Sequence, residues 1–187
     1  MQKKVLTIKL SIAGLMTALI FIFINIRIPL STHHQMIHMG DIFCVIAGLI
    51  LNPALGGLCA GLGCFIFDIL NPMFISSAPF TFLFKFLMTF ICSVIAHKIK
   101  NKCSNYTGNS IAAIVGVFVY IVLRSIKAFI YNFFILQIPL QSVLILVGKV
   151  ILVSSINGVL TVLVAVPLAD IIIKALMKNK LYEFIEN

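Results

Sequence analysis

The fold of this chain is decided by its most regular apolar stretch, residues 52–72, which reads NPALGGLCAGLGCFIFDILNP. An Asn-Pro dipeptide stands at each end, and such dipeptides are typical of turns. Between them the residues are apolar except for Asp68, and Gly, Ala and Cys recur at a spacing that lets two helix backbones approach closely. The stretch therefore predicts a short membrane helix over residues 54–70 that packs against neighbouring helices inside a bundle.

The composition of the whole chain is that of a membrane protein. Of its 187 residues, 61% are hydrophobic and only 10% are charged, and the mean hydropathy is +1.17. Soluble domains are about 45–50% apolar and about 25% charged, so a soluble globular protein is excluded. Six spans of about 20 residues use roughly 120 residues, which leaves no room for a separate soluble catalytic domain.

Breaks in the apolar pattern predict the remaining helices. Residues 27–40 contain Pro29 and three histidines, and this segment is too polar to cross lipid. The last apolar run contains Pro167 and is longer than one perpendicular span requires, so its helix should be tilted or kinked. We predict an all-α integral membrane protein with a single domain, 1–187, whose six transmembrane helices cover about 8–26, 41–52, 54–70, 79–96, 110–136 and 142–174.

The distribution of basic residues predicts the orientation of the chain in the bilayer. The net charge of +9 comes mostly from lysines that flank the apolar runs. This placement is typical of membrane topology, so we expect no nucleic-acid partner. The connections on the opposite side carry only Arg27. The positive-inside rule then predicts that both termini are cytoplasmic, together with Lys3, Lys4, Lys9, Lys98, Lys100, Lys102, Lys174, Lys178 and Lys180.

Polar and charged side chains collect near the outer ends of the predicted helices. A rise of about 1.5 Å per residue places these side chains in one layer. Charges inside a span are costly, so they normally face a partner or a water-filled cavity. We therefore predict a substrate-binding site formed by Arg27, His33, His34, Gln35, His38, Asp41, Asp68, Asn71, Lys85, Arg124, Lys127, Tyr131, Asn132, Lys149 and Asn157.

The balance of charge in this layer predicts the kind of ligand. Five cations against two carboxylates leave an excess of three positive charges, which suits an anionic or acceptor-rich ligand. The alternative is internal pairing, such as Asp68 with Lys85, together with snorkelling of Lys127 or Lys149 to the interface. The charges counted are Arg27, Lys85, Arg124, Lys127 and Lys149 against Asp41 and Asp68.

Metal and enzyme functions have weak support. His33, His34 and His38 lie close together, but adjacent histidines on a loop make a poor cage, so hydrogen bonding or gating is favoured over a metal site. Asp41 also suits the N-cap of the helix that follows it. The sequence contains neither a phosphate-binding G-x-x-x-x-G-K-[ST] loop nor a G-x-S-x-G elbow. We expect no catalytic residue and no cofactor, and any ATP must be bound by another subunit.

Small residues indicate where helices meet. Those between Gly56 and Cys64 should pack inside the bundle, because a short helix between two tight turns lies centrally. The first predicted helix carries two overlapping small-x-x-x-small pairs. This stripe suits either internal packing or docking of another membrane subunit, and its members are Ala13 with Thr17 and Gly14 with Ala18.

An ordered set of short motifs resembles the S-components of energy-coupling factor (ECF) transporters, in particular the branch with H-x-G-D before the second span. The resemblance covers roughly Leu10 to Ala96 by motif, and the second half by length and topology. In order, the motifs are Ile28-Pro29-Leu30, His38-Met39-Gly40-Asp41, the Gly-rich span from Gly56 to Asp68, and Ala78-Pro79-Phe80 leading to Phe84-Lys85.

The resemblance implies a multi-pass protein of the bacterial cell membrane that captures a vitamin at the outer face. It also implies association with a transmembrane T-subunit and two cytoplasmic ATPases. Family members dock the T-subunit with an A-x-x-x-A motif, where this chain has Ala13 and Thr17 in one register and Gly14 and Ala18 in the other. The segment from Arg27 to Asp41 matches the family's external gate.

The substrate implied by the branch is pyridoxine-like or hydroxymethylpyrimidine-like, with riboflavin as an alternative. An acidic or phosphorylated ligand would suit the positive excess at least as well. A ligand ring has candidate stacking partners in Phe74, Phe80, Phe82 and Tyr131. The rival class is a self-sufficient secondary transporter of a small anionic or aromatic solute, acting as a dimer. Such a carrier transports alone, whereas an S-component requires ATPase partners for concentrative uptake.

Overall fold

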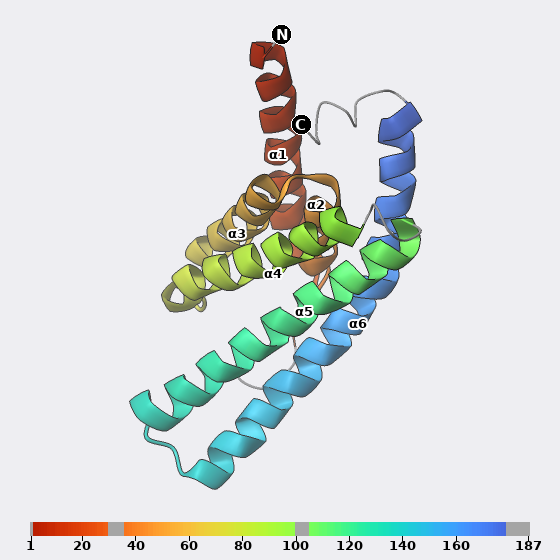
Figure 1. Cartoon of the computed structure of the whole chain (residues 1–187). Coiled ribbons are helices and arrows are strands. Elements are labelled where there is room, and N and C mark those ends of the chain that lie inside the picture. Colours follow the sequence, from red (N-terminus) through yellow and green to blue (C-terminus); the bar gives the residue numbers. More distant parts are fainter. Residues whose placement is uncertain (1, 30–35, 100–104, 179–187) are drawn as a thin grey trace.

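The computed structural model describes residues 2–29, 36–99 and 105–178. Within this part of the chain, two short strands, a 3-10 turn and one π-helical turn accompany six α-helices (Figure 1). The strands are β1 (Arg27–Pro29) and β2 (Met36–His38), and the turns are η1 (Ile75–Ser77) and η2 (Tyr131–Ile135). The helices are α1 (Gln2–Ile24), α2 (Gly40–Ile50), α3 (Pro53–Leu70), α4 (Ala78–Ile99), α5 (Asn105–Ile130) and α6 (Leu140–Lys178).

Five of these helices are long and apolar enough to cross a membrane, namely α1, α3, α4 with η1, α5 with η2, and α6. Helix α2 is different, because its 11 residues rise only about 16 Å against a hydrocarbon core of about 30 Å. Large apolar side chains are exposed on the outer faces of the long helices, for example Phe134 at 65% and Leu163 at 66%. An all-α membrane protein is confirmed, with five spans supported by helix length.

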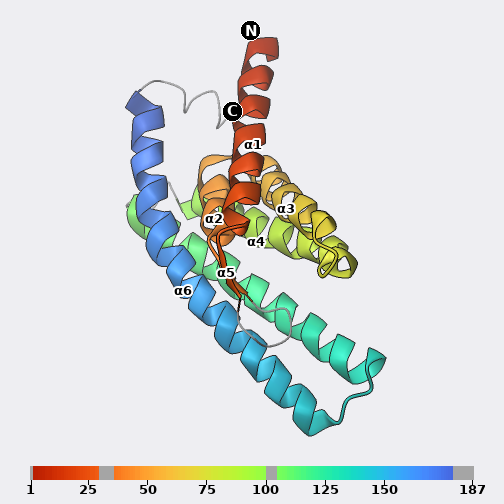
Figure 2. The ribbon, with the colours of Figure 1, turned by 180° about the vertical axis from the view of Figure 1, so that it is seen from behind.

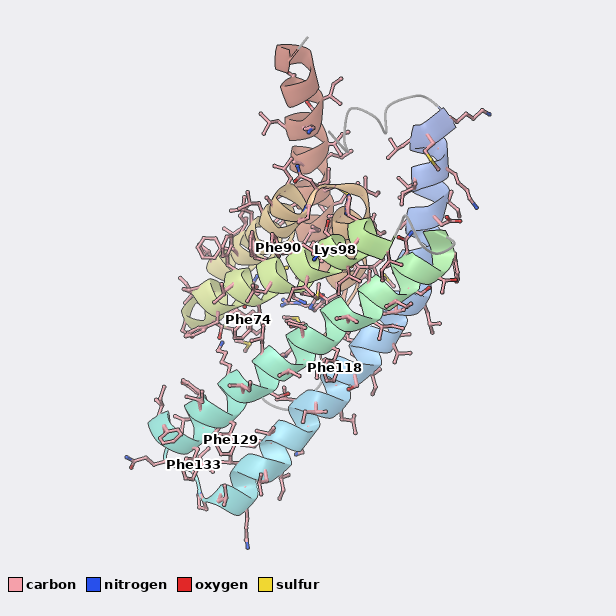
Figure 3. The ribbon with its side chains drawn as sticks, viewed as in Figure 1. Phe74, Phe90, Lys98, Phe118, Phe129 and Phe133 are labelled. Atoms are coloured by element: carbon pink, nitrogen blue, oxygen red, sulfur yellow. The ribbon has the colours of Figure 1, made fainter. Side chains whose placement is uncertain are left out.

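The first turn of α1 and the last turn of α6 lie at the same end of the molecule (Figures 1 and 2). The α5–α6 connection lies at the other end, and the turn between α3 and α4 lies at the side of the molecule between the two ends. Helix α6 bends along its length and contains Pro167, the residue that predicted a kink. In Figure 3, Lys98 near the end of α4 lies toward the chain ends, whereas Phe74 lies at the opposite end of α4.

The core of the bundle is built around α2, which contacts each of the other five helices. Ten of its eleven residues are buried, including Asp41 in the first turn. The backbone at Gly40, the first residue of α2, packs closely against α1, because a Cβ on Gly40 would lie 2.1 Å from Cγ1 of Ile24. The residues that lead into α2 are therefore held against α1.

Helix α3 shows why the stretch of the opening paragraph decides the fold. The side chain of Asn52 accepts the backbone N–H of Leu55 at 2.9 Å, and Pro53 occupies the first turn, so the Asn-Pro dipeptide starts the helix. Cβ atoms on Gly57 and Gly61 would lie 2.9 Å from the rings of two α4 phenylalanines. The expected internal role of this small-residue stripe is confirmed.

The segment after α1 forms a β-hairpin that sequence patterning did not predict. Strand β1 pairs antiparallel with β2, and Arg27 stands opposite His38 while Pro29 stands opposite Met36. Three-residue strands are too short to show an alternating pattern. The hairpin brings His38 back beside the start of α2.

Candidate ligand-binding site

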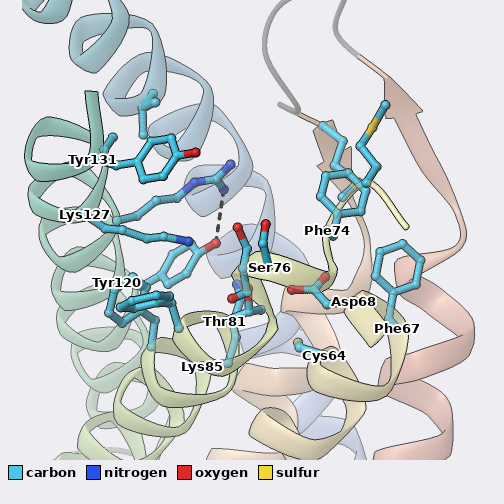
Figure 4. A pocket seen from close by; sticks show the side chains of 18 of the residues that line it. Cys64, Phe67, Asp68, Phe74, Ser76, Thr81, Lys85, Tyr120, Lys127 and Tyr131 are labelled. Carbon is cyan, nitrogen blue, oxygen red and sulfur yellow. Dashed lines mark hydrogen bonds between the residues drawn. The ribbon is translucent and has the colours of Figure 1, made fainter. Parts of the chain in front are cut away.

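A cavity of about 520 Å³ lies among the β2 strand, the η1 turn and helices α3 to α6. Its walls combine rings, hydroxyls and charged groups, as Figure 4 shows from close by. The aromatic lining residues are Phe67, Phe74, Phe80, Phe84, Tyr120 and Tyr131. The polar lining residues are His38, Asp68, Ser76, Ser77, Thr81, Lys85, Arg124, Lys127 and Asn132.

A buried ion pair supports one wall of the cavity. The ammonium group of Lys85 on α4 pairs with Oδ1 of Asp41 on α2, and both side chains are almost fully buried. The amide of Asn157 on α6 donates to the other carboxylate oxygen at 2.8 Å. The Lys85 Nζ atom also lies 3.5 Å from the centre of the Tyr120 ring. These contacts satisfy both charges and join four helices.

This pairing corrects the alternative in which Lys85 pairs with Asp68. The partner of Lys85 is Asp41, 44 residues away in sequence, whereas Asp68 lines the cavity. The pair leaves the predicted excess of positive charge unchanged, because both of its charges were counted; the excess at the cavity is smaller than predicted because Arg27 and Lys149 do not line it. Because sequence periodicity does not rank the possible partners of a buried charge, the pairing required the three-dimensional packing of α2 against α4.

Helix α5 supplies two further cations to the cavity, Arg124 and Lys127. Arg124 and Lys127 lie three residues apart, on one face of the helix, and both line the cavity. The Arg124 Nη1 atom donates to the Tyr120 hydroxyl at 3.1 Å, drawn as a dashed line in Figure 4. The Lys127 Nζ atom lies 4.7 Å from the centre of the Phe80 ring. Tyr120 was missed from the sequence, although its position four residues before Arg124 was a usable signal.

His38 connects the hairpin to the buried ion pair. Its side chain is 10% exposed, and its Nδ1 atom lies 3.9 Å from Oδ1 of Asp41 without a hydrogen-bond partner among the described residues. Burial lowers the pKa of His38 from 6.5 to about 4. The Asp41 carboxylate opposes this shift, while Lys85, Arg124 and Arg27 add to it. The imidazole is therefore neutral at neutral pH.

The structure brings together many of the residues predicted for the site. The predicted residues that line the cavity are His38, Asp68, Lys85, Arg124, Lys127, Tyr131 and Asn132, and Asp41 and Asn157 lie directly behind Lys85. Of the predicted stacking residues, Phe74, Phe80 and Tyr131 line the cavity. Phe82 does not, because its ring packs against Gly61 of α3.

Other predicted site residues lie elsewhere. Lys149 is exposed on α6 and does not line the cavity. The guanidinium carbon of Arg27 lies 5.3 Å from the centre of the Phe67 ring, so Arg27 stands behind a lining ring. The Asn71 amide donates to the Phe67 carbonyl at 2.8 Å and ends α3. His33, His34 and Gln35 fall outside the described residues.

The stripe on α1 divides into two faces. The carbonyl of Ala13 accepts the Cys59 thiol at 3.3 Å, and a Cβ on Gly63 would lie 3.0 Å from the Thr17 carbonyl. This face is therefore occupied by α3. On the other face, Ala18 is exposed, and a Cβ on Gly14 would meet nothing within 4 Å. The Ala13 and Thr17 register therefore packs against α3, whereas the Gly14 and Ala18 register is exposed.

Fold and cavity together define a multi-pass membrane protein that holds a ligand-sized, polar and aromatic cavity among its helices. The family model described as "ECF-type riboflavin transporter, S component" matches residues 4–176. The chain therefore belongs to this family of ECF transporter S-components, membrane proteins of vitamin uptake. The family resemblance seen in the sequence is confirmed.

Two solved structures share the fold. One is described as the S component of a bacterial ECF transporter, with 22% identity, a TM-score of 0.65, and coverage of 94% of this chain and 99% of that chain. The other is an S-component for biotin from an ECF-type ABC transporter, with 22% identity, a TM-score of 0.62, and coverage of 87% and 90%. The comparison with curated proteins found no match.

Proposed function

We propose that this protein is the substrate-binding subunit of an ECF-type vitamin importer and that it is not itself an enzyme. The carrying observation is the cavity of about 520 Å³, which combines six aromatic rings with charged and hydroxyl groups. Small-molecule sites are typically concave, about 300–1,000 Å³, and mostly apolar with a few placed polar groups. A small, water-soluble vitamin with a flat ring fits this combination of ring faces and hydrogen-bonding groups.

Riboflavin is the first ligand to test. The description of the matching family names it, and the cavity offers rings on α3, α4 and α5 against which a flat ring can stack. The pyridoxine-like and hydroxymethylpyrimidine-like ligands implied by the H-x-G-D branch come next. Smaller rings of that kind would use fewer of the aromatic walls.

The orientation and partners follow from the family and from charge. With both termini in the cytoplasm of a bacterial cell, the η1 turn and the hairpin face outward, and the cavity receives its ligand from outside. In this arrangement α2 completes six membrane helices without crossing the full bilayer by itself. Delivery requires a transmembrane T-subunit and two cytoplasmic ATPases. Gly14 and Ala18 form the face of α1 that is free to dock the T-subunit.

Ligand identification tests the proposal directly. The protein is purified in detergent from cells grown in rich medium and denatured, and any released small molecule is identified by mass spectrometry. The expected result is one vitamin or vitamin precursor per protein. Titration of ligand-free protein with riboflavin should then quench flavin fluorescence and raise the melting temperature by mass action. A blank release and no thermal shift with a vitamin panel would contradict the proposal.

Reconstitution separates the importer from the rival secondary transporter. In proteoliposomes that contain only this protein, riboflavin is expected to bind without concentrative uptake. Uptake should appear when a T-subunit, two ATPases and ATP are added. Concentrative uptake of a small anionic or aromatic solute by the protein alone, driven by an ion gradient, would favour a dimeric carrier instead.

A further inference from the structure

The two cations of α5 differ from Lys85 in how their charge is compensated. Lys85 is paired with Asp41, so its charge is cancelled behind the cavity wall. Arg124 and Lys127 form no ion pair with any described carboxylate, since the pairs within 4.0 Å involve other residues. Their contacts are a tyrosine hydroxyl and aromatic rings. Among the described residues, these two side chains therefore bring positive charge to the cavity wall without a direct ion-pair partner.

Both side chains also retain unused hydrogen-bond donors. A guanidinium group carries five N–H donors and an ammonium group three, and neither can accept a hydrogen bond. Arg124 uses one N–H on the Tyr120 hydroxyl, and the Lys127 ammonium lies over the Phe80 ring, which leaves its N–H donors without a carboxylate. Figure 4 shows Lys127 and Tyr120 pointing into the cavity from the same wall.

Across the cavity the charge has the opposite sign and is smaller. Asp68 on α3 lies near Ser76 of η1 and Thr81 of α4, so one carboxylate and two hydroxyls face the α5 wall (Figure 4). Two cations and one carboxylate leave the lining with one net positive charge once the Asp41–Lys85 pair is set aside. A ligand with one anionic group would neutralise this excess.

We propose that Arg124 and Lys127 form an anion subsite, and that the natural ligand carries a phosphate or carboxylate group in addition to its flat ring. This inference rests on the proposed function and specifies its substrate class. The planar guanidinium binds two oxygens of such a group side by side, while the nearby ammonium supplies a point charge. The ring of the ligand then lies among the phenylalanines, and Asp68 accepts from a donor at its other end.

Pairs of ligands that differ in one anionic group test this inference. Binding to the purified full chain in detergent is measured by calorimetry for riboflavin against flavin mononucleotide, and for pyridoxine against pyridoxine 5′-phosphate and 4-pyridoxic acid. The two anionic pyridoxine derivatives distinguish a phosphate site from a carboxylate site. The anionic member of a pair should bind about ten- to a hundredfold more tightly, because a hydrogen bond to a charged group contributes about this much affinity.

Three variants assign the preference to the α5 wall. Arg124→Gln and Lys127→Gln should each reduce the ratio of anionic to neutral affinity by about tenfold, and Arg124→Lys should retain part of it. Lys149→Gln is the matched control, because it removes the same charge from an exposed position outside the cavity and should leave the ratio unchanged. The melting temperature of each variant shows that it is folded.

The outcomes separate this inference from the proposed function. Equal or tighter binding of the neutral member overturns the anion subsite and leaves the vitamin-binding subunit in place. A preference for the anionic member that persists in both glutamine variants also overturns the assignment to Arg124 and Lys127. If neither member of any pair binds, the anion subsite is overturned, and the proposed function fails as well only when the vitamin panel also gives no thermal shift.

Discussion

Replacing Lys85 by methionine should destabilise the protein more than almost any other single change of charge. The substitution keeps most of the length of the side chain but leaves the buried Asp41 carboxylate with Asn157 as its remaining hydrogen-bond donor among the described residues. Removing one partner of a buried ion pair typically costs about 3–5 kcal/mol, because the other charge stays in a low-dielectric surrounding. The expected loss in the free energy of unfolding is therefore about 4 kcal/mol.

The reverse change tests the same pair from the other side. Asp41→Asn leaves the Lys85 ammonium over the Tyr120 ring, 3.5 Å from its centre. A desolvated cation–π contact of this kind contributes about 2 kcal/mol, so this variant should lose somewhat less than Lys85→Met. The double variant should be more stable than the sum of the two single losses predicts, with a coupling of at least about 2 kcal/mol.

Reversible unfolding in mixed detergent micelles, followed by circular dichroism, measures these free energies. Lys174→Gln serves as the control, because it breaks an ion pair with Asp170 whose lysine side chain is 69% exposed. Exposed pairs contribute about 0–1 kcal/mol, so the control should be nearly neutral. A loss below about 1 kcal/mol for Lys85→Met, or strict additivity in the double variant, would refute the reasoning.

Three further predictions use other parts of the structure. Gly61→Val should lower the free energy of unfolding by about 1–3 kcal/mol, because its Cβ would lie 2.9 Å from the Phe82 ring. The control Gly148→Val has nothing within 4 Å of its Cβ and should cost less than half as much, so equal losses would argue against tight α3–α4 packing. Asn52→Ala should lower stability by about 1 kcal/mol through loss of the α3 cap, measured in the same micelles, and no change would contradict the capping role. His38 binds a proton more weakly in the folded state, where its pKa is about 4 rather than 6.5, so the free energy of unfolding should fall by about 3 kcal/mol as the pH drops from 6.5 to 4. A His38→Gln variant should remove this pH dependence, and an unchanged pH dependence would refute its assignment to His38.

The helices and their limits were largely predictable because polar punctuation interrupts an otherwise apolar chain. Asn52 and Pro53 predict the start of α3, and the structure shows the cap and the first-turn proline that this dipeptide implies. The convergence of Asp68 and Lys127 on one cavity was also predictable, because charges within membrane helices seek a polar surrounding. Helix rise gave their depth along the bundle.

What the sequence did not determine was which side of a helix faces inward. Helix α6 is apolar on most of its surface, so the pattern did not separate the buried Asn157 from the exposed Lys149. The π-helical turn over Tyr131–Ile135 likewise has no signature in the apolar pattern, although it contains the cavity residues Tyr131 and Asn132. Rotation of a helix about its axis follows from side-chain packing, which a uniformly apolar sequence leaves undetermined.

The segment His38-Met39-Gly40-Asp41 shows how four residues place a cavity wall and a core charge together. His38 ends β2 and lines the cavity, and Asp41 begins the buried charge network on α2. Gly40 permits this short connection, because any Cβ at this position would collide with Ile24 of α1. Since both polar residues belong to one tightly held turn, a ligand that displaces His38 also acts on the surroundings of Asp41. The hairpin, the cavity and the α2 core therefore meet at this turn.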